Sequence, residues 1–173
     1  MKLELGAGPD RQTPGYLHND VNPFAGIDYV GNAWELDLPD GSLSEVIAVS
    51  FMEHLTYAHV RDTLANVYRM LEPRGVFLFD VPNLAAWCRY FLEGHPDFDQ
   101  AYCLRTLYGW QRWPGDEHIS GWTPDLLEEY VMAAKFSQWT VGPEPLDFVE
   151  RDIYRYRFTR WKDDAHWFVQ AVK

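Results

Sequence analysis

The sequence predicts an α/β fold built on a mostly parallel sheet, and three observations support this. Short apolar segments that end in Gly, Pro or Asp turns recur along the chain. A helical pattern separates two of them, which makes a strand–helix–strand unit. The 173 residues, 47% of them hydrophobic, suit a single domain over residues 1–173 with a sizeable core.

The elements of the first half follow from local patterns. Strands are expected at residues 2–6, 16–21, 27–30 and 45–50. Residues 56–72 predict a helix, because their apolar side chains recur every three or four positions. Pro73-Arg74-Gly75 ends this helix, and the continuous apolar run 76–81 is expected to be a strand buried on both faces.

The second half is less regular. Residues 84–122 are rich in aromatic side chains and predict two short helical pieces that form a lid. Thr123-Pro124 marks another helix start, because a hydroxyl N-cap is followed by proline at the first helical position. Residues 136–141 and 166–172 are expected to be closing strands. Charged and apolar residues alternate over residues 151–160, which predicts a strand with one charged face.

Composition excludes several classes of protein. The formal net charge of −11 repels phosphate backbones, so no nucleic-acid partner is expected. Two cysteines without a CxxC pair, and six histidines without ligand spacing, predict neither a disulfide framework nor a metal site. No signal sequence or long apolar stretch is found, so a soluble, cytoplasmic protein without membrane insertion is expected. The oligomeric state stays open, a homodimer included.

The most informative segment is the apolar run Leu3-Glu4-Leu5, which enters the turn Gly6-Ala7-Gly8. Glycines one residue apart let the backbone bend sharply and come close to a ligand. A dinucleotide fingerprint would need a third glycine where Arg11 stands, and a Walker loop would need a lysine and a hydroxyl. The segment favours a nucleoside cofactor without a pyrophosphate, such as S-adenosylmethionine (SAM). An ordinary strand followed by a turn is the alternative.

Several segments together resemble the motifs of class I SAM-dependent methyltransferases, in particular their compact type 11-like branch. Residues 3–9 are similar to the first motif, residues 16–22 to the ribose-binding second strand, and residues 30–43 to the stretch that holds adenine. Residues 50–55 resemble the Glu-His motif after the fourth strand, and residues 69–83 resemble the end of the next helix and the strand that follows it. The resemblance covers about the first 83 residues, in order and at plausible spacing.

The resemblance implies a Rossmann-like, doubly wound sheet of about seven strands whose last strand is antiparallel. It assigns residues 1–83 to cofactor binding and residues 84–173 to the acceptor, the lid and the closing strands. It also implies an abbreviated N-terminus, so that one wall of the cleft comes from elsewhere. Two positions depart from the family: Asn32 stands where Asp is more frequent, and Arg74 where a second glycine is usual.

The implied cofactor-binding residues are Glu4, Gly6, Ala7, Gly8, Asp20, Val21, Asn32, Ala33, Trp34, Phe51 and Met52. Asp20 would accept both ribose hydroxyls, with an Asx turn as the alternative. Asn32 would hydrogen-bond to adenine and Trp34 would stack on it, unless Trp34 belongs to the core. Glu4 would orient the glycine loop or contact the cofactor amine, with a purely structural acid as the alternative.

Methyl transfer needs alignment, exclusion of water and, for a hydroxyl or amine acceptor, a proton acceptor. The candidates for that role are His54, Glu53 and His118; for a histidine, a structural role is the alternative. Aromatic side chains would line an acceptor pocket for an apolar or cationic molecule, or simply pack the lid. These side chains are Tyr57, Trp87, Tyr90, Tyr108, Trp110, Trp113 and Trp122.

The resemblance therefore implies methyl transfer from SAM to a small-molecule acceptor, such as a sugar, a lipid-linked intermediate or a secondary metabolite, leaving S-adenosylhomocysteine. The main alternative is a non-catalytic SAM-binding module that acts as a regulatory or assembly partner. Another SAM enzyme, such as a lyase or an aminopropyl transferase, is a second alternative. The missing third glycine disfavours a nicotinamide oxidoreductase.

Overall fold

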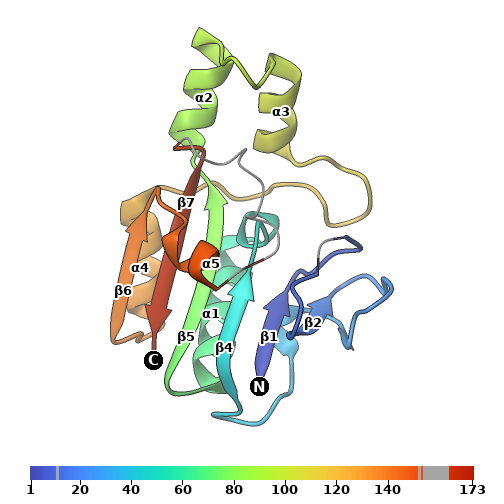
Figure 1. Ribbon diagram of the computed structural model, residues 1–173, viewed down its shortest axis with the longest axis vertical. Helices are drawn as coiled ribbons and strands as arrows, with labels where there is room; N and C mark the ends of the chain where they lie inside the picture. Colours follow the sequence, from blue (N-terminus) through green and yellow to red (C-terminus); the bar gives the residue numbers. More distant parts are fainter. Residues whose placement is uncertain (11, 152, 154–163) are drawn as a thin grey trace.

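The computed structural model describes residues 1–10, 12–151, 153 and 164–173 (Figure 1). The elements in chain order are β1 (Lys2–Leu5), β2 (Leu17–Asp20), β3 (Tyr29–Val30), the 3-10 helix η1 (Ala33–Glu35), β4 (Leu43–Ala48), the 3-10 helix η2 (Met52–His54), α1 (Tyr57–Met70), β5 (Leu71–Pro82), α2 (Leu84–Glu93), α3 (Gln100–Tyr108), α4 (Pro124–Ala133), β6 (Gln138–Gly142), α5 (Leu146–Glu150) and β7 (His166–Val172). No helix in this part of the chain is both long and apolar enough to span a bilayer.

The seven strands of the described residues form one sheet of order β3-β2-β1-β4-β5-β7-β6. The pairs from β3 to β5 are parallel, whereas β7 is antiparallel to both β5 and β6. The predicted Rossmann-like sheet with an antiparallel last strand is confirmed. Parallel strands end at a common edge, and β7 begins there because it runs the opposite way. That edge is where open α/β sheets bind their ligands.

Helices cover the two faces of the sheet unequally (Figure 1). Behind the sheet, α1 and α4 pack on a large core that includes Leu64, Phe77 and Val131. In front of it, α5 contributes Phe148 to a smaller cluster that includes Leu78. Burial of these apolar side chains is the main favourable term that holds the helices on the sheet.

Helix α1 begins as its sequence pattern indicates. The Thr56 hydroxyl caps it by accepting a hydrogen bond from the His59 N–H at 3.2 Å. The helix ends at Met70 rather than at residue 72, because Leu71 already pairs with Leu43 of β4. The register then shifts, so the predicted turn before residue 76 is an irregularity inside a longer strand.

At the other edge of the sheet, strand β3 is shorter than predicted: it covers Tyr29–Val30 of the expected residues 27–30.

That irregularity places Arg74 in the left-handed region, with φ of 68°. A side chain there costs about 1 kcal/mol, which glycine avoids. We expect Arg74→Gly to raise the free energy of unfolding by about 0.5 kcal/mol or more, measured by urea denaturation. Ala65→Gly on the exposed face of α1 is the control: because glycine is unfavourable inside a helix, this change should lower the free energy of unfolding by about 1 kcal/mol. An Arg74→Gly variant no more stable than the parent would contradict the strain.

The lid rises beyond the carboxyl edge of the sheet as α2 and α3 (Figure 1), the two helical pieces predicted within residues 84–122. Trp87, Phe98 and Cys103 pack between them. Asn83 ties α2 to the start of β7, because its N–H donates to the Ala165 carbonyl at 2.9 Å. The predicted start of the next helix is confirmed, with Thr123 as the N-cap of α4. Of the strand predicted over 151–160, only residue 151 and residue 153 lie within the described part.

Candidate active site

A cleft of about 620 Å³ lies at the carboxyl edge of the sheet. Its walls come from the turn after β1, the ends of β2 and β3, the segment after β4, and residues 102–118 of the lid. The predicted site residues that line it are Gly6, Gly8, Asp20, Val21, Asn32, Ala33, Trp34, Phe51, Glu53, His54, Trp110, Trp113 and His118. One cavity thus joins the predicted cofactor end to the predicted acceptor end.

The glycine turn has the geometry that the sequence predicts. Gly6 and Gly8 have φ of 61° and 67°, in the region that favours glycine. A Cβ atom on Gly6 would lie 2.2 Å from Cδ2 of Phe51, so no side chain fits there. The mouth of the turn faces the cleft. The backbone can therefore approach a ligand directly.

Two neighbours of the turn support it from within the protein. Glu4 is fully buried, and its carboxylate accepts the Thr13 N–H at 2.7 Å. Ala7 is also buried, and its N–H donates to the Asn19 carbonyl at 3.0 Å. Neither residue lines the cleft. Of the roles predicted for Glu4, this favours orientation of the loop over contact with the cofactor amine. For Ala7, the predicted cofactor contact is corrected to support of the loop.

Asp20 lies at the end of β2 and connects the turn to the cleft. Its Oδ2 accepts the Gly8 N–H at 2.9 Å, and its Oδ1 accepts the Asn22 N–H at 2.8 Å. The second contact is the Asx turn that was the alternative to ribose binding. The Asn22 side-chain amide also donates to Oδ1, at 3.3 Å. Because each carboxylate oxygen can accept about two hydrogen bonds, Oδ2 retains capacity for a ligand hydroxyl.

The far end of the cleft is formed by Asn32, Ala33 and Trp34. The Asn32 amide donates to Oε2 of Glu35 at 2.7 Å. One face of the Trp34 indole stacks on the His59 ring, with centroids 4.0 Å apart and planes 9° apart. This end offers a flat, partly apolar wall with an amide beside it. Met52, by contrast, is buried in the main core and does not line the cleft, which corrects its predicted cofactor contact.

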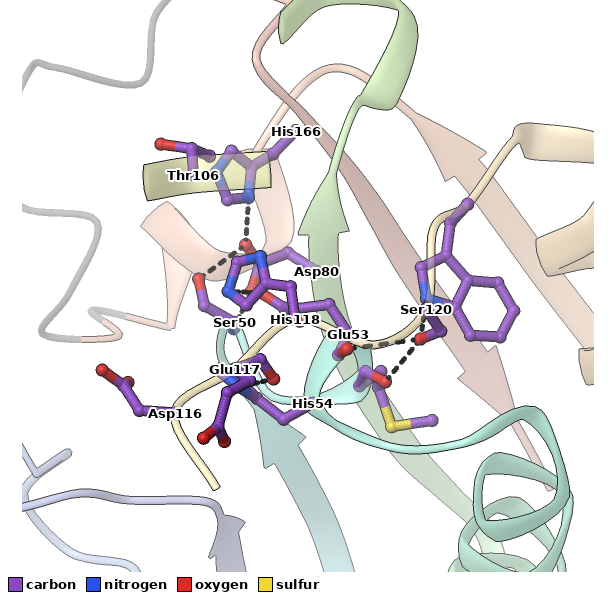
Figure 2. Close-up of polar contacts among 12 residues, drawn as sticks. Ser50, Glu53, His54, Asp80, Thr106, Asp116, Glu117, His118, Ser120 and His166 are labelled. Atoms are coloured by element: carbon purple, nitrogen blue, oxygen red, sulfur yellow. Dashed lines mark hydrogen bonds and ion pairs between the residues drawn. The ribbon is translucent and has the colours of Figure 1, made fainter. Parts of the chain in front are cut away.

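Glu53, His54 and His118 meet at the lid end of the cleft (Figure 2). Nε2 of His118 lies 3.9 Å from Oε1 of Glu53, and the two imidazole centroids are 4.6 Å apart. The group offers one ligand atom from each side chain, all within 4.8 Å of one another. The sequence analysis found no metal-ligand spacing because His118 is far along the chain from the other two residues.

Hydrogen bonds hold the two segments of this group together. The Glu53 carbonyl accepts the N–H groups of Ile119 at 2.9 Å and of Ser120 at 3.1 Å. Nδ1 of His54 lies 3.0 Å from the Glu117 carbonyl, so this nitrogen is assigned the proton and donates to that oxygen (Figure 2). The ring has a second backbone hydrogen-bond contact, with Ser50.

Burial makes both imidazoles weak bases. It lowers the pKa of His54, against the opposing effect of the Glu117 carbonyl. It lowers the pKa of His118 to about 4, and the neighbouring His54 contributes to the same shift. Both rings are therefore neutral at pH 7, when they act as hydrogen-bond acceptors or as metal ligands.

The depressed pKa of His118 predicts acid sensitivity. The unfolded chain binds a proton near pH 6.5 while the folded chain stays neutral, so stability falls between pH 6.5 and about 4. We expect a loss of roughly 3 kcal/mol from this group, measured by urea unfolding in a chelating buffer. His118→Gln should flatten the profile in this range, leaving the weaker slope from His54. An unchanged profile would contradict the buried neutral ring.

The sequence analysis missed a second polar group at this edge. The buried Asp80 accepts the Ser50 N–H at 2.7 Å through Oδ1, and its Oδ2 lies 2.6 Å from Nδ1 of His166 (Figure 2). Ser50 has φ of 49°, which this hydrogen bond helps to hold. The order of the predicted strands could have indicated this group. Ser50 and Asp80 lie at the carboxyl ends of β4 and β5, and His166 begins the antiparallel β7, so all three residues are at the same edge of the sheet.

The aromatic residues of the lid divide into two sets. Trp110 and Trp113 line the cleft, together with Tyr102 and Thr106, which the sequence analysis did not single out. The other predicted pocket residues lie elsewhere and their assignment is corrected: Trp87 and Tyr90 pack within the lid, Trp122 is in the main core, and Tyr57 and Tyr108 are exposed outside the cleft. Indole rings that are buried against apolar neighbours stabilise the lid rather than bind ligands.

Arg112 and Asp116 form a charged wall of the cleft, which the sequence analysis also missed. The guanidinium donates to the Asp116 carboxylate through Nε at 2.9 Å and through Nη2 at 3.0 Å. Burial opposes ionisation of Asp116, but the hydrogen bonds from Arg112 outweigh it and lower the pKa of the carboxyl. Arg112 also lies over the Trp113 ring, 4.1 Å from its centroid.

Comparison with known proteins gives a family match and a set of similar folds. Residues 15–79 match the family model described as a methyltransferase domain. A SAM-dependent methyltransferase from Archaeoglobus fulgidus has 17% identity and a TM-score of 0.63, over 99% of this chain and 85% of that chain. No curated protein sequence matches the chain.

Two further similar structures contain ligands. The phosphoethanolamine N-methyltransferase 2 of Haemonchus contortus, in complex with SAM, has 17% identity and a TM-score of 0.58, over 99% of this chain and 48% of that chain. The 1,6-didemethyltoxoflavin-N1-methyltransferase of Burkholderia thailandensis, with bound 1,6-didemethyltoxoflavin and S-adenosylhomocysteine, has 16% identity and a TM-score of 0.57, over 99% of this chain and 70% of that chain. At these identities the comparisons establish a shared fold.

Proposed function

We propose that this class I SAM-dependent methyltransferase transfers a methyl group from SAM to a small-molecule acceptor at the lid end of its cleft. The family match over residues 15–79 and the fold support the enzyme class and the cofactor. The observation that carries the proposal is the continuity of one cleft, in which Gly6, Gly8 and Asp20 line one part and His54 and His118 another.

The cofactor is proposed to lie along the edge of the sheet. Asp20 would accept a ribose hydroxyl through Oδ2, which its contacts to Gly8 and Asn22 leave with capacity for a further hydrogen bond. Trp34 and the Asn32 amide would border the adenine. The methionine part would pass over the Gly6–Gly8 turn, where the absence of side chains permits close approach.

The acceptor is proposed to lie under residues 102–118. Tyr102, Trp110 and Trp113 offer apolar surface there. The ion pair of Arg112 with Asp116 supplies polar atoms without a net charge. This lining suits a neutral or cationic molecule with an apolar part, and a sugar, a lipid-linked intermediate or a secondary metabolite fits that description.

Methyl transfer to an O–H or N–H acceptor would need three things from this chain. The cleft would align the acceptor with the sulfonium carbon, which removes much of the entropic barrier. The lid would exclude water. A neutral imidazole, of His54 or of His118, would take the acceptor proton as the new bond forms and the carbon–sulfur bond breaks.

The experiment is a transfer assay with SAM labelled in its methyl group and fractionated small-molecule extracts as acceptors. We expect label in a small product, lost when Asp20 is replaced with alanine. Asp40→Ala is the matched control, because Asp40 is an exposed partner of Arg69 outside the cleft. SAM binding without any labelled product, across extracts, would favour the non-catalytic module instead.

A further inference from the structure

We infer that Glu53, His54 and His118 form a binding site for one divalent transition-metal ion, of the Zn²⁺ or Fe²⁺ class, at the lid end of the cleft. The sequence analysis expected no metal. The inference goes beyond the proposed function, because metal binding by these residues does not require SAM or methyl transfer.

The three side chains are close to a coordinating arrangement. Their ligand atoms lie within 4.8 Å of one another, and His118 Nε2 is 3.9 Å from Glu53 Oε1. Donors bound to one ion at ~2.1 Å are about 3.4 Å apart in a tetrahedron. A closure of roughly 0.5 to 1.4 Å, within the reach of side-chain rotation, would bring them to that spacing.

The donor set selects the class of metal. Two imidazoles and one carboxylate are the ligands of catalytic zinc sites and of non-haem iron sites. Hard cations such as Mg²⁺ and Ca²⁺ prefer sites made of oxygen atoms alone. Three protein ligands also leave open positions, and all three residues line the cleft, so these positions would be accessible to a small molecule.

The surroundings of each imidazole match those of a metal ligand. Nδ1 of His54 lies 3.0 Å from the Glu117 carbonyl, and the ring has a second backbone contact, with Ser50; these contacts orient the ring. His118 has a backbone hydrogen-bond contact with Thr106.

The site is also pre-organised by the backbone. Glu53 and His54 belong to η2. The Glu53 carbonyl accepts hydrogen bonds from Ile119 and Ser120, which directly follow His118. Figure 2 shows Ser120 beside Glu53. The Ser120 hydroxyl adds a contact to the Met52 carbonyl at 3.3 Å. The two ligand-bearing segments are therefore fixed relative to each other before any ion binds.

A metal ion at this site would favour acceptors that carry a hydroxyl or thiol group. A hydroxyl or thiol group bound at an open position would have its pKa lowered and would release its proton to water in the cleft. The resulting oxygen or sulfur anion would attack the methyl carbon, and the sulfonium sulfur would keep the electron pair of the broken bond. This consequence, unlike the metal site itself, rests on the proposed function.

The test uses the full chain without an affinity tag, stripped with a chelator and then titrated with Co²⁺ and Zn²⁺. We expect a visible d–d spectrum with Co²⁺ at one ion per chain, and a Kd of about 1 µM or tighter for Zn²⁺ by calorimetry. His118→Ala, His54→Ala and Glu53→Gln should each weaken binding by at least about tenfold. His95→Ala, which removes a lid histidine outside the cluster, is the matched control and should bind like the parent.

Two readouts keep the outcomes distinct. Circular dichroism and SAM titration of every variant show whether it is folded, and Zn²⁺ should raise the Tm of the parent but not that of His118→Gln. A parent that binds SAM but gives no Co²⁺ spectrum overturns the metal site and leaves the methyltransferase proposal standing. Binding that survives all three ligand variants also overturns it. Metal binding without SAM binding instead contradicts the proposed function alone.

Discussion

Replacing Asp20 with alanine should weaken SAM binding by more than about tenfold, or ~1.4 kcal/mol. Two effects combine in this variant. The proposed contact to a ribose hydroxyl disappears, and the Gly8 N–H loses the acceptor that holds the glycine turn against β2. Isothermal titration with SAM and with S-adenosylhomocysteine measures the loss, and both ligands should be affected equally because they share the ribose.

Asp20→Asn tests the acceptor role of the side chain with little change in its shape. The amide keeps one oxygen acceptor of nearly the same shape, so it can still hold either Gly8 or a ribose hydroxyl. We expect an affinity between those of the parent and of the alanine variant. Asp40→Ala, an exposed change outside the cleft, should bind as the parent does. Unchanged SAM affinity in Asp20→Ala would exclude the ribose role.

Replacing Gly6 with alanine should abolish measurable SAM binding or reduce it by at least about a hundredfold, ~2.7 kcal/mol. The added Cβ would lie 2.2 Å from Cδ2 of Phe51, and φ of 61° is unfavourable for any side chain. Relief of the clash must move the Phe51 ring or the turn, and both line the cleft.

Gly15→Ala is the matched control for backbone strain. Gly15 has φ of 83°, but a Cβ there would meet nothing within 4 Å, and it does not line the cleft. Each variant should lose about 1 kcal/mol of unfolding free energy from the left-handed conformation. Only Gly6→Ala should lose SAM affinity. Equal affinities in the two variants would show that the turn does not contact the cofactor.

The sequence predicted the fold because its signals are local. The periodicity of α1, the Thr123 N-cap and the glycines of the first turn each act over a few residues, and each lies in the structure where it was expected. The errors are at boundaries. The start of β5 at Leu71, for example, depends on pairing with Leu43, which no local pattern contains.

In the candidate site, the residues that follow strands were predicted correctly to line the cleft, but several aromatic residues of the lid were not. The residues after β1, β2 and β4 were found because they follow strands and therefore reach one edge. Trp87 was assigned to a pocket by composition, yet it is buried, and its indole N–H donates to the Ala165 carbonyl at 2.8 Å. An aromatic-rich segment does not indicate which rings face inward, because no regular period runs through the lid.

Local sequence by itself determined most of the strands and helices in their order, although not α5, and also the bare glycine turn and the acid that follows it. Backbone preference and hydrophobic period act between near neighbours. Only the tertiary structure decided that His118 lies beside Glu53 and His54, and that His166 reaches Asp80. Those contacts form because the lid folds back over the sheet edge and the last strand runs antiparallel. Both are consequences of burying the whole core at once rather than of any single segment.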